Sequence, residues 1–456
     1  MLLSADPGIH FLLHYRHTQS EPTAMTIHTL TFRAGVTTTV EVDDENLLFY
    51  AAPPSSATEV DQKEVIEDAL NSPVGSGRLE EELDPGDRVA VLVDDITRPT
   101  PSAAILPHVL KRIHGRGIAR EQVKIVMAMG THRPMTDEEL RVKLGDEVVD
   151  SYAIVNRDYR EKSRYVPLGT TESGTPIEVD REVLDADFVI GIGNICPHIS
   201  AGWSGGSKII LPGVCSQKTT DMMHYVACTV QSVLEIIGSR ENKPREEMDI
   251  IAEKVGLKFI VNTVLNDNHN IIRLFAGDFV EAHKAACAFA EDIMIVPVPA
   301  QADILIVSAN PCHFDYWQGV KPYTYAHRAV REGGVYIFLL DGGEGLCGDA
   351  PSHDYTVRTY LLHTFEQLKA GVASGEITDI VGVNVPMYHS MVRNRVAKNF
   401  VVTNHLQQRD IDALGFERVD TVRGALEKGY ELLGRDAKVG IIPSGGEMLV
   451  KVSPRS

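Results

Sequence analysis

The sequence contains no apolar run approaching the roughly 20 residues needed to cross a bilayer, so a membrane-spanning role is not expected. Basic residues are also in short supply. The chain has 44 Lys and Arg against 63 Asp and Glu, which gives a formal net charge of −19. An excess of this sign repels phosphate backbones and anionic lipids, so neither nucleic acid nor a membrane is an expected partner. Anionic small molecules are not excluded, because a few cations inside a cleft dominate locally.

Cysteine is scarce and follows no metal-binding or redox pattern. The six cysteines are scattered along 456 residues without CxxC or CxH spacing, which argues against a zinc ribbon or a disulfide scaffold and suits a reducing cytoplasm. Hydrophobic residues make up 43% of the chain and charged residues 23%, as in ordinary globular proteins, so most of the chain is expected to fold. Its length allows about two to four domains.

The first residues differ from the body of the chain. Residues 1–24 lack the basic start and sustained apolar stretch of a signal peptide, and we expect a disordered or misassigned leader there. The segment TIHTLTFRAGVTTTVEV, which follows Met25, is typical of a β-hairpin.

From Arg88 onward, short apolar strands such as RVAVLVDD, DFVIGIGN and ADILIVSAN alternate with amphipathic helical segments. Continuous apolar strands separated by helices predict parallel sheets buried on both faces. PVPAQAD resembles a linker before a fresh strand. We therefore predict the α/β class, with two α/β domains of largely parallel sheets and the active site in the cleft between them. The first domain is expected at 25–296 and the second at 297–456, whose final segment could return to the first.

Four predicted strands run into unusual polar sequences at their carboxyl ends: DITRP, THRP, ICPHISAGWSGGSK and PCHFDYWQGVK. In an open parallel sheet, ligands bind beyond the carboxyl ends of the strands. These segments are therefore expected to converge on one catalytic cleft. They supply Asp95, Arg98, His132, His198, Lys208, His313, Gln318 and Lys321.

The segment DDITRPTP allows two interpretations. Asp94 and Asp95 are suited to capping the N-terminus of the following predicted helix. Alternatively, Arg98 binds a carboxylate bidentately, because its guanidinium keeps its charge at any pH. Asp95 would then hold a hydroxyl or a cofactor group.

Two histidines and a polar pair also leave alternatives open. His132 follows a strand-ending glycine, where a histidine is equally suited to an incidental surface position and to general acid–base work. His224 lies on a predicted helix, and a lone helical histidine is more often a core or surface residue than a ligand. Gln318 and Lys321 are three residues apart, so one helical turn could direct both at a carboxylate, or they could form a solvated helix start.

The segment PHISAGWSGGSKIILPG is the most specific in the chain. Its Ser204, Gly205 and Gly206 form a loop able to turn backbone N–H groups toward an anion, although a purely structural turn is the alternative. It is not a P-loop, because GxxxxGK[ST] is not satisfied. Lys208 at its end suits either a phosphate-pairing cation or a desolvated amine that forms a covalent adduct.

Together these segments resemble the nickel-pincer lactate racemase family. The resemblance rests on DDITRP, GTHRPMTDEE, PHISAGWSGGSKIILPG, DMMH and WQGVK, in the family's order and at its intervals. It implies a racemase or epimerase of short-chain 2-hydroxy acids. It also implies a nickel cofactor, pyridinium-3,5-bisthiocarboxylic acid mononucleotide, and maturation by cofactor-biosynthesis enzymes.

The resemblance further implies a role for each matching residue. Lys208 would carry the cofactor as a thioamide and His224 would be the protein's own nickel ligand, since imidazole suits Ni(II). His132 and His198 would be the acid–base pair. The cofactor contacts would be Asp95, Ser204, Gly205 and Gly206. The substrate contacts would be Arg98, Gln318, Lys321 and Trp317, and Arg98 would also take part in catalysis.

The mechanism that the resemblance implies is a hydride transfer. One histidine takes the hydroxyl proton while the α-hydride passes to the cofactor, which leaves a 2-keto acid. Hydride then returns to the opposite face and the other histidine returns the proton. The sequence departs from the family pattern in two respects. The bulk of Trp317 is expected to restrict the substrate to short aliphatic side chains, and only Tyr388 and His389 are candidates for a later aromatic cofactor contact.

Three other classes compete with this interpretation. A zinc-dependent hydrolase or lyase would use His132, His198 and His224 as ligands, but HExxH and other close histidine pairs are lacking. A non-enzymatic carrier of a nickel cofactor would not need two acid–base histidines. A nicotinamide dehydrogenase is disfavoured because GIGNIC is not GxGxxG.

Overall fold

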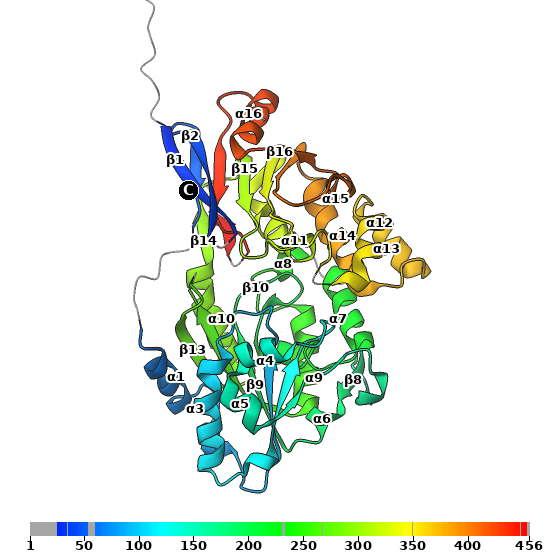
Figure 1. Cartoon of the computed structure of the whole chain (residues 1–456). Helices are drawn as coiled ribbons and strands as arrows, with labels where there is room; N and C mark the ends of the chain where they lie inside the picture. The colour runs from blue at the N-terminus through cyan, green and yellow to red at the C-terminus, as the bar shows by residue number, and fades with distance from the viewer. Residues whose placement is uncertain are drawn as a thin grey trace, which may run out of the picture.

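Two six-stranded sheets organise the protein, one in each half of the molecule in Figure 1. The predicted hairpin is confirmed, because β1 (Met25–Arg33) pairs antiparallel with β2 (Val36–Asp43). The expected leader lies outside the described residues. The computed structural model describes residues 25–33, 35–52, 60–229, 233–266, 268–348, 350–446 and 448–453.

The first sheet has the strand order β13-β12-β9-β4-β5-β6 and is parallel except at its edge, where β13 runs antiparallel to β12. Along β4, Val91 faces one hydrophobic core and Leu92 faces another. Because helices cover both faces, Val89 to Val93 are all buried, which explains the continuous apolar sequence of this strand. The strands are β4 (Val89–Asp94), β5 (Val123–Ala128), β6 (Ala153–Val155), β9 (Phe188–Asn194), β12 (Leu257–Leu265) and β13 (Ile271–Asp278).

Helices on both sides of this sheet supply the covering apolar side chains. A small antiparallel pair, β7 (Tyr165–Thr170) and β8 (Pro176–Asp180), also belongs to this half. The helices are α1 (Gln62–Asn71), α2 (Leu79–Glu82), α3 (Ser102–Gly115), α4 (Asp137–Leu144), α5 (Asp146–Ser151), α6 (Arg181–Leu184), α7 (Gln217–Thr229), α8 (Val233–Ile236), α9 (Lys243–Val255) and α10 (Glu281–Met294).

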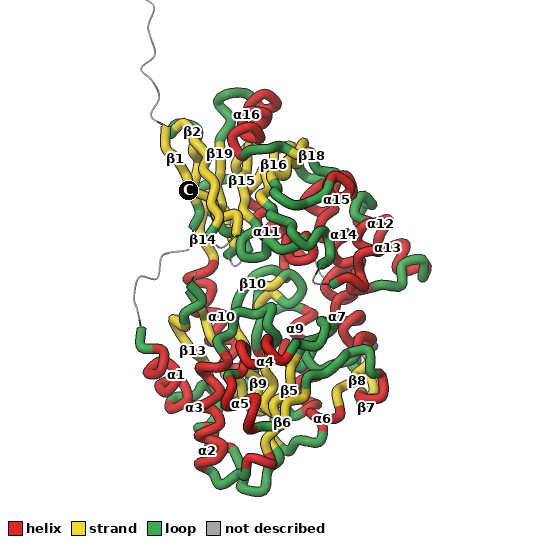
Figure 2. Tube along the Cα trace, in the orientation of Figure 1, coloured by secondary structure: helices red, strands yellow, loops and turns green. Residues whose placement is uncertain are grey.

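The second sheet is wholly parallel, with the order β18-β17-β16-β15-β19-β3. Figure 2 shows its strands in the upper half; the hairpin and the helix Val422–Leu433 cover one face of the sheet, and the other helices of this half pack on the opposite face. Its strands are β3 (Leu47–Tyr50), β15 (Ala302–Ser308), β16 (Val330–Leu339), β17 (Lys398–Val402), β18 (Glu417–Arg418) and β19 (Val439–Ile442); its helices are α11 (Tyr316–Tyr325), α12 (Asp354–Tyr360), α13 (Phe365–Ser374), α14 (Ile380–Arg393), α15 (Gln408–Leu414) and α16 (Val422–Leu433).

The beginning of the described chain packs on this second sheet. Strand β3 forms its edge beside β19, and Leu30 and Phe32 of the hairpin share a core with Ile306 of β15. Strand β14 (Ile295–Val298), at the passage between the halves, pairs with β20 (Leu449–Val452). The division of the chain at residue 296 stays a prediction, while in space residues 25–50 add to the second sheet.

The predicted α/β class with largely parallel sheets is confirmed. Among the described residues, every helix falls short of the length and apolar character that a bilayer crossing demands.

Candidate active site

A pocket lies where the loops at the carboxyl ends of the first sheet meet α11 and α14 of the second half. It encloses about 1160 Å³, including the part open to solvent, which is room for a nucleotide-sized ligand and a small substrate. Seven of the eight residues expected to converge line this pocket: Asp95, Arg98, His132, His198, Lys208, Gln318 and Lys321.

The eighth residue, His313, does not line the pocket. Its ring packs against Phe314 with the centroids 4.3 Å apart, and its carbonyl accepts a hydrogen bond from the Gly342 amide. The polar loop that carries it ends at Asp315, which caps α11 by accepting from the Gln318 amide at 2.9 Å. The loop therefore delivers the helix to the pocket rather than its own histidine.

His132 is paired with a buried carboxylate. Its Nδ1 lies 2.9 Å from Oδ2 of Asp95, while Oδ1 of Asp95 accepts from the Thr97 amide at 2.8 Å. Burial alone would raise the pKa of Asp95, but the His132 charge and hydrogen bond, followed by the Arg98 charge, bring that pKa well below its usual range. Asp95 is therefore ionised and orients the ring of His132 through Nδ1, so that Nε2 is the nitrogen turned away from the carboxylate.

The turn that carries Asp95 and Arg98 is held in place by the buried side chain of Lys143. Lys143 of α4 places its ammonium 2.7 Å from Oδ1 of Asp94 and donates to the carbonyls of Arg98 at 2.9 Å and Thr100 at 3.2 Å. The N-cap position of α3 is Pro101, which makes no side-chain capping bond. The capping interpretation of the aspartate pair is therefore wrong.

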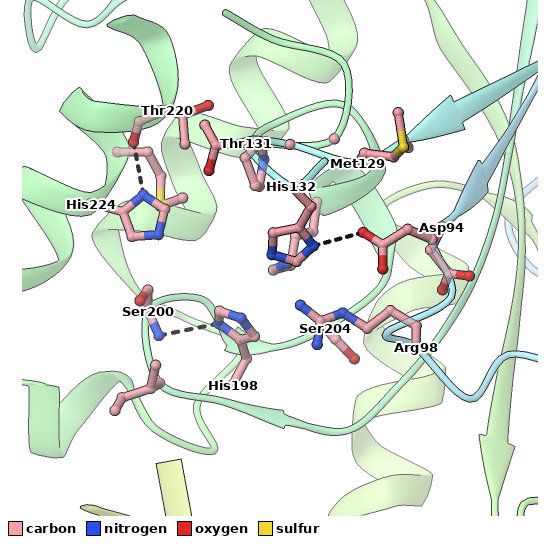
Figure 3. Close-up of a pocket in the computed structure, with 18 of the residues that line it drawn as sticks. Asp94, Arg98, Met129, Thr131, His132, His198, Ser200, Ser204, Thr220 and His224 are labelled. Atoms are coloured by element: carbon pink, nitrogen blue, oxygen red, sulfur yellow. Dashed lines mark hydrogen bonds and ion pairs between the residues drawn. The ribbon is translucent and has the colours of Figure 1, made fainter. Parts of the chain in front are cut away.

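His198 lies on a very short strand at the other side of the pocket. Strand β10 (Pro197–His198) pairs antiparallel with β11 (Gly202–Trp203), so the ring stands on a tight hairpin. The Ser200 amide donates to Nδ1 of His198 at 3.2 Å. Burial, and then the charges of Lys208, Lys321 and Arg98, lower the pKa of His198 well below its usual value. Figure 3 shows His132, His198, His224 and Arg98 around one space.

Lys208 is a desolvated amine among cations. It ends the glycine loop on the short helix η3 (Gly206–Ile209) and lines the pocket. Burial lowers its pKa to about 7, helped by the charges of Arg98, Lys321 and Arg245 and opposed by Cys196. A large fraction of this amine is consequently neutral and nucleophilic near neutral pH.

The glycine loop is held from behind by a buried arginine. Arg245 of α9 donates to the Gly205 carbonyl at 3.0 Å. Gly206 has a φ of 59°, in the left-handed region that glycine tolerates, and its amide donates to Oδ1 of Asn262 at 2.7 Å. Ser204 and Gly205 line the pocket, whereas Gly206 does not. The Gly206 amide, expected to face an anion, is thus used by the protein itself.

His224 on α7 has the features of a single metal ligand. Its Nδ1 donates to the Thr220 carbonyl at 2.9 Å, which fixes the ring and leaves Nε2 as the lone-pair nitrogen. Burial lowers the pKa of His224 to about 4, so the ring is neutral at physiological pH. Across the described residues, histidine, cysteine and carboxylate groups nowhere gather in threes as a protein-only metal site. The residues therefore fit a metal that brings most of its own ligands, and they do not supply the three-histidine zinc site considered above.

The second half of the chain completes the pocket. The Lys321 ammonium donates to Oε1 of Gln318 one turn before it on α11. Trp317 stacks on the buried ring of His353, with 4.9 Å between centroids and 5° between planes, so its indole is a rigid wall. Tyr388 of α14 also lines the pocket.

His389 turns away from the pocket. Its Nδ1 lies 2.6 Å from the Tyr316 hydroxyl, and its Nε2 lies 3.0 Å from the Leu414 carbonyl. Of the two candidates for a later aromatic contact, only Tyr388 therefore borders the space.

Some pocket residues escaped sequence reasoning. Asn194 ends β9 and Asn262 lies in the middle of β12, a strand whose sequence LKFIVNTVL is otherwise almost wholly apolar. A buried amide inside such a strand was the available signal. Thr131 and Asn384 line the pocket with no comparable signal.

The fold and the pocket together define an α/β protein in which two histidines, an arginine and a desolvated lysine share one pocket at the carboxyl ends of a parallel sheet. The N-terminal domain model of lactate racemase matches residues 35–235, and the C-terminal domain model matches residues 298–450. The lactate racemase of Lactiplantibacillus plantarum is 30% identical over 427 residues, covering 91% of this chain and 97% of the relative. The chain belongs to the lactate racemase family, and it is an isomerase.

Two further comparisons agree. The lactate racemase of Thermoanaerobacterium thermosaccharolyticum is 28% identical over 401 residues, which cover 86% of this chain and 91% of the relative. The solved structure of a lactate racemase apoprotein from the same organism superposes with a TM-score of 0.83 at 25% identity, covering 93% of this chain and 100% of that one.

Proposed function

We propose that this protein racemises lactate or a similarly short 2-hydroxy acid, using a nickel-pincer nucleotide joined to Lys208. The observation that carries the proposal is the pairing of His132 and His198 in one pocket with Arg98. Racemisation needs proton exchange with the substrate in both of its configurations, and two acid–base groups from different strands suit that task. The similarity to named lactate racemases supports the choice of lactate.

Substrate binding is assigned to the cations of the pocket. Arg98 can grip a carboxylate through two parallel hydrogen bonds, and Gln318 and Lys321 reach the same space from α11. The rigid Trp317 side chain borders this space, and its bulk favours a substrate with a short aliphatic side chain.

Proton transfer is assigned to the two histidines. With Nδ1 committed to Asp95, His132 accepts the hydroxyl proton at Nε2. His198 is neutral by virtue of its environment and serves as the corresponding base for the opposite enantiomer. The keto acid formed between the two transfers stays bound by its carboxylate, because Arg98 keeps its charge throughout.

The cofactor would be held by this chain's own residues. Lys208 offers a neutral amine for the covalent link and His224 offers a neutral imidazole for the metal. When bound, the nickel-pincer nucleotide supplies the acceptor and donor of the α-hydride, which protein side chains cannot provide.

The experiment is to produce the chain together with enzymes that make the cofactor, and then to measure its intact mass, nickel content and chiral conversion of L- and D-lactate. We expect a mass increment, nickel and racemisation. Lys208→Ala should lose all three and keep its fold, whereas Lys218→Ala, at an exposed lysine paired with Glu178, should lose none. An increment that persists in Lys208→Ala would overturn the attachment site. A loaded protein without racemisation of short 2-hydroxy acids would favour the carrier alternative.

A further inference from the structure

A hydroxyl group from the second half of the molecule holds the strand that carries His198. The Tyr325 hydroxyl donates to the Pro197 carbonyl at 2.9 Å, and the oxygen of that hydroxyl accepts a hydrogen bond from the Ile199 backbone amide. Both chain neighbours of His198 are thus fixed by one side chain. Tyr325 is only 4% exposed, and burial raises the pKa of its hydroxyl well above the usual value, so it remains a proton donor.

Tyr325 belongs to the helix that also carries proposed substrate contacts. Lys321 lies one turn and Gln318 two turns before it on α11, so all three share one face. That face meets the pocket through Gln318 and Lys321 and meets β10 through Tyr325. The position of the helix therefore fixes the position of the histidine strand.

A second side chain, from α14, contacts the segment on the C-terminal side of His198. The Tyr388 hydroxyl of α14 lies 2.8 Å from Oγ of Ser200. The amide of Ser200 donates to Nδ1 of His198, as the dashed line in Figure 3 shows. The first half supplies the ring of His198, and the second half holds the backbone on both sides of it.

We propose that Tyr325 is a positioning residue. It couples substrate binding by α11 to the position of the His198 side chain. The inference rests on the proposed function. When Gln318 and Lys321 engage a carboxylate, the same helix holds Pro197 and Ile199, and the imidazole is kept at reach of the substrate oxygen. His132 has its own support in Asp95 and needs no such contact. Tyr325 thus serves one of the two proton transfers and not the other.

The test compares Tyr325→Phe with Tyr323→Phe. Both changes remove one buried hydroxyl from α11, but the Tyr323 hydroxyl donates to Oδ1 of Asn399 at 2.7 Å, away from β10. The first readout is amide hydrogen exchange over residues 197–203 in the chain without cofactor. We expect faster exchange in Tyr325→Phe than in the wild type, and wild-type exchange in Tyr323→Phe. Equal exchange in the two variants would show that the Tyr325 hydroxyl does not hold the strand that carries His198.

The second readout is the single-turnover formation of keto acid from each lactate enantiomer by the loaded protein. Tyr325→Phe should slow the reaction of one enantiomer roughly 10- to 100-fold, and this should be the enantiomer whose reaction is lost in His198→Ala. The other enantiomer should react at the wild-type rate, as both should in Tyr323→Phe. Equal slowing of both enantiomers would overturn the proposal. If the loaded wild-type protein reacts with neither lactate enantiomer, the proposed function is wrong. Hydrogen exchange alone would then test whether Tyr325 holds the strand that carries His198.

Discussion

Nδ1 of His132 lies 2.9 Å from Oδ2 of Asp95, and this one contact fixes which nitrogen of the ring faces the pocket. Replacing Asp95 with Asn puts an amide where the carboxylate stood and removes the preference for a proton on Nδ1. We expect kcat to fall about 10²- to 10⁴-fold with the fold retained, as when a histidine loses its orienting carboxylate. Chiral chromatography of lactate and circular dichroism provide the measurements.

The matched control for this change is Glu67→Gln. Glu67 pairs with His108 through Oε1 and Nδ1 at 2.6 Å, outside the pocket. The Glu67→Gln variant should keep the wild-type kcat. If Asp95→Asn also retains the wild-type rate, His132 does not depend on its carboxylate for orientation.

Arg98→Lys should prove far from conservative. An ammonium cannot reproduce the two parallel hydrogen bonds of a guanidinium to a carboxylate, so transition-state stabilisation should fall by roughly 2–4 kcal/mol. The measurement is kcat/KM for both lactate enantiomers. Arg133→Lys, at an exposed arginine on the neighbouring loop, is the control and should match the wild type. An unchanged kcat/KM in Arg98→Lys would place Arg98 outside substrate binding.

The two histidines should fail in opposite ways. In each loaded single variant, His132→Ala or His198→Ala, racemisation should stop, while one enantiomer still yields bound keto acid because its base is intact. The measurement is keto acid in quenched mixtures of each variant with each pure enantiomer. Opposite preferences support two bases on opposite faces. The same preference in both variants would defeat that arrangement.

Lys208 should lower the free energy of unfolding of the protein without cofactor. Its folded pKa of about 7 lies below the value of an unfolded lysine, near 10.4, so folding expels its proton at neutral pH. Lys208→Met should therefore raise the free energy of unfolding by roughly 2–4 kcal/mol below pH 7. The gain should shrink as pH rises from 7 and vanish above about 10.4, where the unfolded lysine is neutral as well. Denaturant unfolding at pH 6 and pH 10 tests this, and equal gains at both would contradict the pKa assignment.

The parts of the structure that the sequence predicted are those that local patterns determine. Apolar strands running into polar loops indicated the parallel sheets and brought Arg98, His132 and Lys208 to one pocket, because parallel strands share a carboxyl edge. His313 obeyed the same pattern but turned away, since side-chain direction within a loop depends on packing that no local pattern records.

Contacts between distant segments were beyond reach for a different reason. The pairing of β3 with β19 joins strands from opposite ends of the chain, and neither strand carries a sign of its partner. Tyr325 was not singled out from the sequence, because its contact is with a backbone carbonyl on another element. The pairing of His132 with Asp95 was likewise absent from the expectations, although both residues were singled out.

The place of β3 also sets an order of events during synthesis. All strands of the first sheet come from one stretch, between Val89 and Asp278, so this sheet can form while the rest of the chain is still on the ribosome. Strand β3 emerges before any of them, yet its neighbour β19 is among the last segments made. Completing the second sheet therefore has to wait for the end of synthesis and closes a long loop of chain, and until then the β3 segment lacks its strand partner.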